Sequence, residues 1–561
     1  MKALFCAQHF GYYRNFESAI RELARRGHAV HLSADEPDSL GGRALVERLA
    51  AECPGVSWSF APALDDEPWI NTARKGRHAL EYVRFLDPRG DASKYRARAA
   101  TRAPRLVRAL ARWRAFRSRP ARATLARLLV AVERRMPTSA ALERYVAALA
   151  PDVVLLASMT NPGSPQLDHM KCARRLGLPT VMCVFSWDHL SGKSWIRMPP
   201  DRVLVWNETQ KAEAVEQHGV PAERVEVTGA QCYDHWFGAQ PARGREAFCR
   251  AVGLDPARPF VLYACSVLSR PAPVEADFAL EWIRAIRASA DPDLSRVGIL
   301  VRPHPERMGE WDGRDLSAFP NLALCGRNPI DAEAKAEYFE SMYHSAAVVG
   351  LVTTVSIEAA VTGREVLTLE LPAFALHQAG TAHFHYLKTV GGGVLHAADD
   401  IAGHLTQLAA VLRAGGDRSE RNRRFLEAFV RPYGLDVPAT PRFADAVERA
   451  ARLRPERAAV PGRLVGRLAG AGRDGVLAWC LMDAREAEAA VLEHGKAVRK
   501  AVQADGRLQQ RHAKQDEREA RLRAKADARR RKTSARATRV RRRRFGDLTR
   551  RVLARLHVRT G

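Results

Sequence analysis

The amino-acid sequence predicts an α/β protein with two doubly wound, Rossmann-like domains and a basic helical C-terminal extension. Short apolar runs of strand length alternate with helical patterns from residue 2 to about 450. The chain has 561 residues, more than one domain usually holds. The expected parts are an N-terminal acceptor domain at 1–240 with a basic helical insert at 71–140, a C-terminal donor domain at 241–450, a linker at 451–475 and the extension at 476–561.

The composition favours a folded protein with localised positive charge. Hydrophobic residues make up 46% of the chain, which excludes wholesale disorder. The net charge is +26, but residues 71–140 hold 19 Lys and Arg against 4 Asp and Glu, and residues 496–561 hold 24 against 6. The rest of the chain is therefore slightly acidic, and only the two basic segments need a special explanation.

The cysteines and the N-terminus indicate a reducing compartment. None of the nine cysteines forms a CxxC pair, so a thiolate zinc site is not expected, nor any other metal site. The first residues, MKALFCAQHF, lack the apolar core of a signal peptide, and no run reaches 18 apolar residues. We expect a cytoplasmic protein, with the basic segments favouring peripheral association with the cytoplasmic face of the membrane.

The first domain opens with a βαβ pattern. Residues 2–6 form an apolar run, a loop at 7–13 follows, and Phe16, Ile20 and Leu23 recur at helical spacing. The loop contains only Gly11 and not a full GxGxxG fingerprint, so we expect no dinucleotide cofactor, and no other cofactor. After the insert, PDVVLLAS, TVMCVF, RVLVWNE and RVEVTGA read as further strands.

The second domain repeats the alternation. The predicted strands are RPFVLYACS, VGILVRPHP, NLALC, AAVVGLV and EVLTLEL. The predicted helices are residues 278–288, 338–344 and 356–361, with a helical region at 400–450. Pro, Gly and Arg then dominate the linker, and a charged helix without a sustained heptad follows.

Two motifs in the second domain predict a phosphate site. Arg302 and His304 follow the GILV strand in a loop that Pro303 and Pro305 restrict, and both side chains can donate to phosphate oxygens. The alternative is a histidine that merely caps the next turn. Ligand loops gather at the carboxyl ends of parallel strands, which is where this loop is expected.

The second motif follows the AAVVGLV strand. Thr353, Thr354 and Ser356 stand where a helix begins, so their hydroxyl and backbone N–H groups can bind an anion. The alternative is simple N-capping by Thr354. Glu358, one turn on, can accept hydrogen bonds from ribose hydroxyls, or be an ordinary exposed glutamate.

In combination, the strand–HP loop and the strand–TT–helix–Glu motif resemble the donor domain of GT-B-type bacterial surface-polysaccharide enzymes. These include the CDP-glycerol glycerophosphotransferases and the HP-motif sialyl and Kdo transferases. The resemblance implies that His304 with Arg302, and Thr353 with Thr354, contact the donor phosphates. It also implies a nucleotide-linked donor of the CMP, CDP or UDP type and catalysis without a bound metal.

A transferase also needs a base for the acceptor hydroxyl. His9, in the first strand–helix loop, and Asp188, in FSWDH after a strand, are both candidates. Their alternatives are a cap of the first helix for His9 and a turn-stabilising role before Gly192 for Asp188. Weaker candidates for the same face are Gly11, Ser186, Lys193, Gln231 and Ser266.

The sequence thus favours a glycosyltransferase-like enzyme that moves a sugar or polyol phosphate to a polysaccharide or lipid-linked acceptor. One alternative is a nucleotide-sugar 2-epimerase; another is a non-catalytic scaffold that binds membrane or nucleic acid. For the basic segments, anionic lipid is favoured over nucleic acid, because no nucleic-acid module is present, and over a plain solvated tail. Residues 71–140 are expected to contact the membrane or a lipid-linked acceptor.

Overall fold

A computed structural model describes residues 1–455, with gaps at 37–40, 68, 87–92, 114–115, 117, 158, 162–163, 269–271, 330 and 416–418. The described residues belong to one compact unit. The predicted extension and most of the predicted linker lie outside them. None of the helices in this part of the chain is both long and apolar enough to cross a bilayer.

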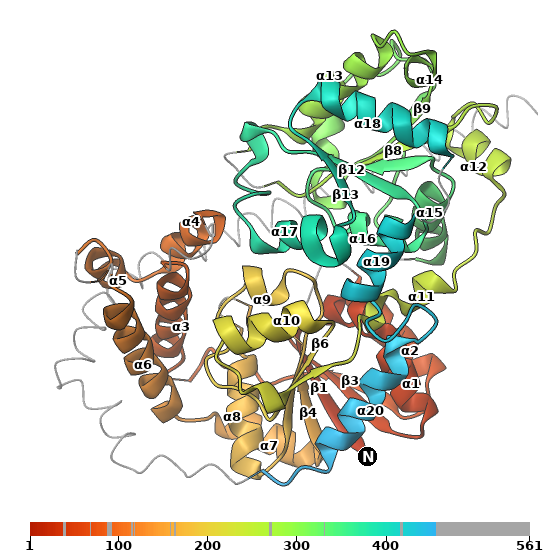
Figure 1. The fold of residues 1–561 in the computed structure, drawn as a ribbon. Coiled ribbons are helices and arrows are strands. Elements are labelled where there is room, and N and C mark those ends of the chain that lie inside the picture. Colours follow the sequence, from red (N-terminus) through yellow and green to blue (C-terminus); the bar gives the residue numbers. More distant parts are fainter. Residues whose placement is uncertain are drawn as a thin grey trace, which may run out of the picture. The chain divides into compact units, whose positions relative to one another are not determined.

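The first domain contains a parallel sheet of seven strands, as the repeated βαβ pattern predicts (Figure 1). Every pair of neighbours is parallel. The order across the sheet is β3 (Val56–Phe60), β2 (Ala29–Glu36), β1 (Lys2–His9), β4 (Val153–Leu156), β5 (Thr180–Cys183), β6 (Arg202–Val205) and β7 (Val225–Val227). This is the doubly wound order: strands are added on one side of β1 as far as β3, and on its other side from β4 onward.

The apolar residues of β1 alternate between two cores, because successive side chains of a strand point to opposite faces. Ala3 and Phe5 pack in one core and Leu4 and Cys6 in the other. Both faces are therefore covered by helices. Those of this domain and its insert are α1 (Glu17–Arg25), α2 (Gly42–Glu52), α3 (Ile70–Arg84), α4 (Ser93–Arg102), α5 (Arg105–Leu110), α6 (Arg119–Arg135), α7 (Ala140–Leu149), α8 (Gln166–Leu176), α9 (His189–Gly192), α10 (Glu208–Ala212) and α11 (Asp234–Phe237).

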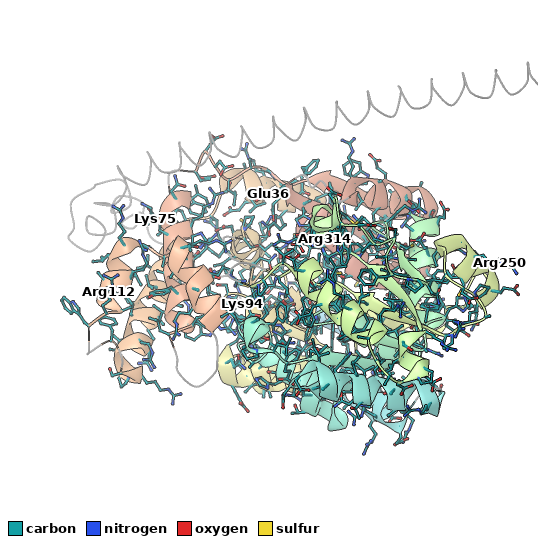
Figure 2. The ribbon with its side chains drawn as sticks, turned by 90° about the horizontal axis from the view of Figure 1, so that it is seen from above. Glu36, Lys75, Lys94, Arg112, Arg250 and Arg314 are labelled. Carbon is teal, nitrogen blue, oxygen red and sulfur yellow. The ribbon has the colours of Figure 1, made fainter. Side chains whose placement is uncertain are left out.

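The basic insert is a packed part of this domain. Helices α3, α5 and α6 share a small apolar core that includes Leu80, Val83 and Val107. Arg77, on α3, is fully buried and pairs with Glu133 on α6 and Asp168 on α8. The positive charge of the insert is therefore partly internal, although Arg112 stays exposed (Figure 2).

The second domain contains a parallel sheet of six strands with the same order of winding. The order is β10 (Leu322–Leu324), β9 (Gly298–Arg302), β8 (Phe260–Ala264), β11 (Ala347–Val349), β12 (Glu365–Leu369) and β13 (Leu395–Ala398). Its helices are α12 (Arg245–Val252), α13 (Glu275–Arg287), α14 (Pro292–Ser295), α15 (Ala332–Tyr343), α16 (Val355–Val361), α17 (Ala382–Thr389), α18 (Ile401–Ala414) and α19 (Glu420–Phe429). The predicted class, α/β with two Rossmann-like domains, is confirmed.

The last described helix, α20 (Ala439–Ala451), returns to the first sheet. Its Phe443 and Val447 lie in the same core as Phe16 and Ile20 of the first domain. Residues 439–450 therefore complete the first domain rather than the second, in which the sequence placed them. The misplacement has a physical reason: an amphipathic helix shows which face is apolar but not which sheet that face covers.

Candidate functional site

Arg302 ends β9 and is held almost entirely by its own domain. It is buried, its NH1 lies 3.4 Å from Glu337, and its NH2 donates to the Arg327 carbonyl at 3.0 Å. Its guanidinium also stacks on the ring of Tyr338, at 4.8 Å from the centroid. Arg302 was predicted as a phosphate ligand, but its donors are largely used within the protein, so it positions Tyr338 and adds positive charge.

Tyr338 connects the two predicted motifs. Its hydroxyl donates a hydrogen bond to Glu358 on α16, while Arg302 covers its ring. Burial raises the pKa of Glu358 to about 7, although the hydrogen bond from Tyr338 and the charges of Arg14 and Arg302 oppose the rise. Glu358 is therefore not an ordinary exposed glutamate, because it is partly buried and bound by Tyr338, and its pKa is raised. We call Arg302, His304, Tyr338, Thr353, Thr354 and Glu358 the donor cluster.

His304 combines the two roles that its sequence position suggested. Its Nδ1 accepts a hydrogen bond from the Glu306 backbone at 3.2 Å, which caps the turn Pro305–Trp311. That bond assigns the ring proton of the neutral imidazole to Nε2, which is then a donor. Burial lowers the pKa of His304, so the ring is neutral at physiological pH.

The threonine pair behaves differently from the capping alternative. The Thr353 hydroxyl, not that of Thr354, accepts from a helix N–H, that of Val355, at 3.3 Å. Thr354 is exposed, and among the described residues its side chain caps nothing. Ser356 is buried inside α16. Of the three predicted hydroxyl groups, Thr354 is thus the best placed to contact a ligand, and Ser356 the worst.

Ser266 joins two loops at the same edge of the second sheet. Its hydroxyl accepts a hydrogen bond from the Val352 backbone at 3.1 Å, and its own N–H donates to Glu275 at 2.7 Å. Burial raises the pKa of Glu275 to about 8. Ser266 therefore supports the loop that leads to Thr353 instead of facing a ligand freely.

Arg14 is a site residue that sequence reasoning missed. It is exposed, in the turn Phe10–Asn15 that follows β1. Burial is the largest influence on the pKa values of Glu358, Tyr338 and His304, and the positive charge of Arg14 lowers all three. The first domain thus presents a cation to the donor cluster. Its position beside Gly11, at the carboxyl end of a strand, was the available signal.

Asp188 lies at the carboxyl end of β5, just before α9. Ser186 Oγ donates to its carboxylate at 2.5 Å, and Lys193 Nζ lies 4.0 Å away. Burial opposes ionisation, but Lys193, His383 and the Ser186 bond together hold the pKa of Asp188 well below its usual range. The Asp188 side chain does not cap α9. Asp188 stabilises the turn only through its backbone carbonyl, which accepts a hydrogen bond from the Gly192 N–H.

Tyr12 is influenced by both candidate bases. His9 is the last residue of β1 rather than a loop residue, and its ring centroid is 4.4 Å from that of Tyr12. Burial raises the pKa of Tyr12, and the charge of Asp188 raises it further. Gly11 lies in the adjoining turn, whereas Gln231 is buried and donates to the Asn15 carbonyl at 3.3 Å. Gln231 therefore holds the turn in place.

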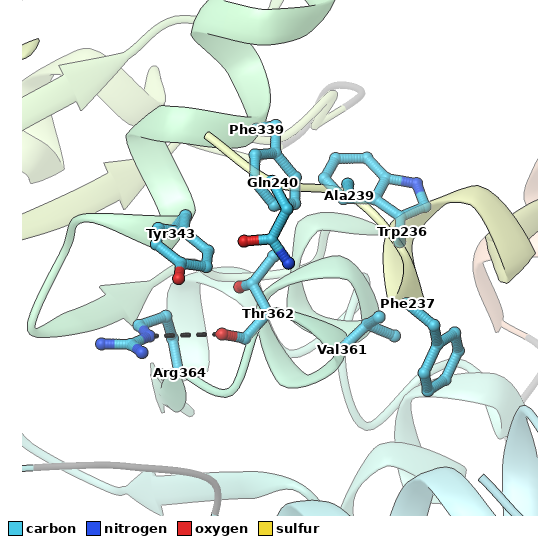
Figure 3. A pocket seen from close by; sticks show the side chains of 9 residues that line it. All are labelled: Trp236, Phe237, Ala239, Gln240, Phe339, Tyr343, Val361, Thr362 and Arg364. Carbon is cyan, nitrogen blue, oxygen red and sulfur yellow. Dashed lines mark hydrogen bonds between the residues drawn. The ribbon is translucent and has the colours of Figure 1, made fainter. Parts of the chain in front are cut away.

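A separate pocket of about 360 Å³ is lined by residues of α11, α15 and α16 (Figure 3). Its aromatic wall includes Trp236, Phe339 and Tyr343. The ring of Trp236 packs on Tyr338 edge to face at 5.7 Å. The pocket therefore lies against the residue that links Arg302 to Glu358. In the described part of the chain, no group of three or more His, Cys, Asp and Glu side chains is arranged to hold a metal ion.

Comparisons with known proteins bear on the fold. No family model matches the chain, and no curated protein matches it. Similar solved structures include a glycosyltransferase from Rickettsia africae (10% identity, TM-score 0.47, covering 80% of this chain and 98% of that one). Others are the UDP-GlcNAc 2-epimerase from Methanocaldococcus jannaschii (11%, 0.44, 80% and 99%) and Anabaena Alr3699/HepE in complex with UDP and glucose (11%, 0.37, 84% and 100%).

The strand orders by themselves define the fold class: α/β, with two parallel, doubly wound, Rossmann-like sheets. The particular activity within that class is a matter for the site residues.

Proposed function

We propose that the chain is a glycosyltransferase-like enzyme that binds a nucleotide-activated sugar or polyol at the donor cluster. It transfers the sugar or polyol phosphate to a surface polysaccharide or lipid-linked acceptor beside Asp188. The observation that carries the proposal is the contact of Tyr338 with both predicted motifs: its ring lies under the guanidinium of Arg302, and its hydroxyl donates to Glu358. The two motifs thereby meet at the carboxyl ends of parallel strands, where ligand loops gather.

Each part of the donor has a matching group. Arg14 and the Nε2–H of His304 supply positive charge and a donor to the phosphate oxygens, and Thr354 adds an exposed hydroxyl. Glu358 accepts hydrogen bonds from ribose hydroxyls. As the bond to the donor breaks, the negative charge that grows on the leaving phosphate is stabilised by the charge of Arg14 and by the hydrogen bond from the neutral ring of His304.

On the acceptor side, Asp188 and His9 remain the candidates for activating the attacking hydroxyl. The ionised carboxylate of Asp188 accepts a hydrogen bond from that hydroxyl and orients it. Its low pKa makes it a weak proton acceptor, because a general base works best with a pKa near the working pH. The enzyme acts at the cytoplasmic face of the membrane, where lipid-linked acceptors are available.

Calorimetric titration of the full chain with UDP, CDP, CMP and GDP tests the donor site. We expect one of these nucleotides to bind, and Arg14→Ala and His304→Ala each to weaken it about 10- to 100-fold, the worth of a charge-assisted hydrogen bond. The exposed residues Arg250 and His385 provide matched controls, as Arg250→Ala and His385→Ala. Binding of none of the four nucleotides would refute the proposal.

A nucleotide-sugar 2-epimerase is the second candidate. Burial raises the pKa of Tyr233, Cys232 raises it further, and the charges of Glu358 and Asp188 add to the rise, so a carboxylate from each domain acts on this one residue. An epimerase converts its nucleotide sugar without an acceptor, whereas a transferase releases nucleotide only when an acceptor or water is consumed. Chromatography of the products formed from UDP-GlcNAc alone separates the two activities.

A further inference from the structure

The basic insert reaches the edge of the first sheet at Asp188. Arg84, on α3, donates to the carbonyls of Leu190 at 2.5 Å and Lys193 at 2.7 Å. Arg98, on α4, donates to the Gly192 carbonyl at 2.9 Å. Two arginines of the insert thus hold the loop that carries Lys193, so the insert helices and this loop form one rigid platform.

Helix α4 also touches the second domain there. The buried Tyr95 has its hydroxyl 3.3 Å from Nδ1 of His383 on α17, and Ser191 reaches the same nitrogen at 3.3 Å. Gly192 allows this approach, because a Cβ at that position would lie 3.0 Å from the Tyr95 hydroxyl. These contacts place the first turn of α4 beside the short helix α9 and the adjoining Gly192, which follow Asp188 in the chain.

Lys94 precedes Tyr95 in that turn, partly exposed, with its ammonium 5.9 Å from the centroid of the Tyr95 ring (Figure 2). Burial lowers the pKa of Lys94 to about 8; the charges of Arg98 and Lys193 lower it too, and that of Asp188 opposes them. Lys94 therefore keeps its charge at neutral pH, close to both Lys193 and Asp188.

The charges at this edge do not balance. Lys94 and Lys193 are two cations beside the carboxylate of Asp188, since Arg98 pairs with the buried Glu81 at 3.2 Å and the charge of Arg84 acts on the buried Glu213. The nearby His377 and His383 add no charge, because burial lowers the pKa of each to about 4 and leaves the rings neutral. One positive charge remains uncompensated, at the place where the acceptor hydroxyl must approach.

We propose that Lys94 and Lys193 bind a phosphate or diphosphate group of the acceptor, which makes the insert a part of the acceptor site. This inference deepens the proposed function and rests on it. It assigns the substrate class: an acceptor that carries phosphate near the attacking hydroxyl, either on an isoprenoid lipid or on a soluble saccharide or polyol. Two ammonium groups about one anion suit phosphate oxygens, which they contact as point charges.

The test titrates inorganic pyrophosphate into the full chain after the donor site has been filled with its nucleotide. We expect Lys94→Ala and Lys193→Ala each to weaken pyrophosphate binding about tenfold, with nucleotide affinity and melting temperature unchanged. Lys75→Ala, another partly exposed lysine of the insert, is the matched control (Figure 2). An unchanged pyrophosphate affinity in Lys94→Ala, or an equal loss in Lys75→Ala, would overturn the inference.

A second titration identifies the source of the phosphate. If farnesyl diphosphate binds more tightly than pyrophosphate and loses the same factor in Lys94→Ala, the acceptor is lipid-linked. If the two affinities are equal, the acceptor is soluble. If no nucleotide binds, the proposed function fails by itself. Pyrophosphate is then titrated into Arg14→Ala/His304→Ala protein with and without Lys94→Ala. Weaker binding after Lys94→Ala supports the inference, and equal binding overturns it.

Discussion

Arg77 donates to both carboxylate oxygens of Asp168, each at 2.8 Å, and this buried pair joins the basic insert to α8. The same guanidinium donates to both oxygens of Glu133, at 3.0 and 2.9 Å. Lys171 completes the network, 3.2 Å from Glu133. The insert is thereby tied to the first sheet by charges that water does not reach.

Replacement of Arg77 should destabilise the protein strongly. Arg77→Met leaves two buried carboxylates with only Lys171 as partner, and a broken buried ion pair costs about 3–5 kcal/mol. Urea denaturation followed by circular dichroism measures the loss. Arg112→Met, at an exposed position of the same insert, should change the free energy of unfolding by less than about 0.5 kcal/mol. Equal effects of the two substitutions would contradict the buried network.

Glu275→Gln should raise stability more as the pH rises. Burial raises the pKa of Glu275 to about 8 from 4.5, so the folded state holds a proton that the unfolded state has lost. Between those pH values the wild type loses up to about 1.4 kcal/mol of stability per pH unit, and glutamine removes that loss. Melting temperatures at pH 5, 7 and 9 measure the trend. Glu281→Gln, exposed on the same helix, should show none.

The pH dependence of turnover should separate the two candidate bases. The pKa of Asp188 lies well below its usual range, so Asp188 stays ionised throughout the range from pH 5 to 8. A fall in kcat toward acid pH within that range would therefore come from a group other than Asp188. Asp188→Asn should lower kcat about 100-fold or more without weakening nucleotide binding.

The control for that substitution is Asp66→Asn, at an exposed position of the first domain. It should leave both kcat and nucleotide affinity unchanged. A kcat in Asp188→Asn equal to that of Asp66→Asn would remove Asp188 from the reaction.

Truncation after residue 470 should abolish binding to anionic membranes. The removed residues include 496–561, whose 24 Lys and Arg outnumber 6 Asp and Glu. Basic residues near a phosphatidylserine surface contribute about 1 kcal/mol each, and salt screens them. Co-sedimentation with phosphatidylserine-containing vesicles at low and high salt measures the loss. Unchanged sedimentation would contradict a membrane role for the extension. Binding of duplex RNA by the full chain, but not by the truncated chain, would favour a nucleic-acid role instead.

The secondary structure was predictable because it depends on local patterns. The runs at 2–6 and 258–266 contain most or all of a strand, β1 and β8 respectively, and the helix expected at 356–361 is α16, one residue longer. The destination of α20 was not predictable, since its apolar face fits either sheet. The extent of β1 also differed: His9 pairs with Glu36 across the sheet, and a polar residue at a strand end gives no local signal of such pairing.

The site could be predicted only in part, because it depends on contacts between segments that are distant in the sequence. Arg302 ends β9 and Glu358 lies in the helix after β11, two strands of one parallel sheet, and Tyr338 contacts both side chains. That Arg302 is used internally by Glu337 and Tyr338, and that Arg14 approaches from the other sheet, depends on side-chain contacts between distant segments. No local pattern encodes such contacts.

By itself, the sequence determined the class of the fold, the order of its elements and the strand ends where a phosphate site is expected, because periodicity and turn residues act over a few positions. Only the tertiary structure decided which charges are buried and which remain for a ligand. It placed Arg77 inside the insert and Lys94 beside Asp188, although both are cations of one basic segment. Burial and partners, rather than residue type, determine what each charge can do.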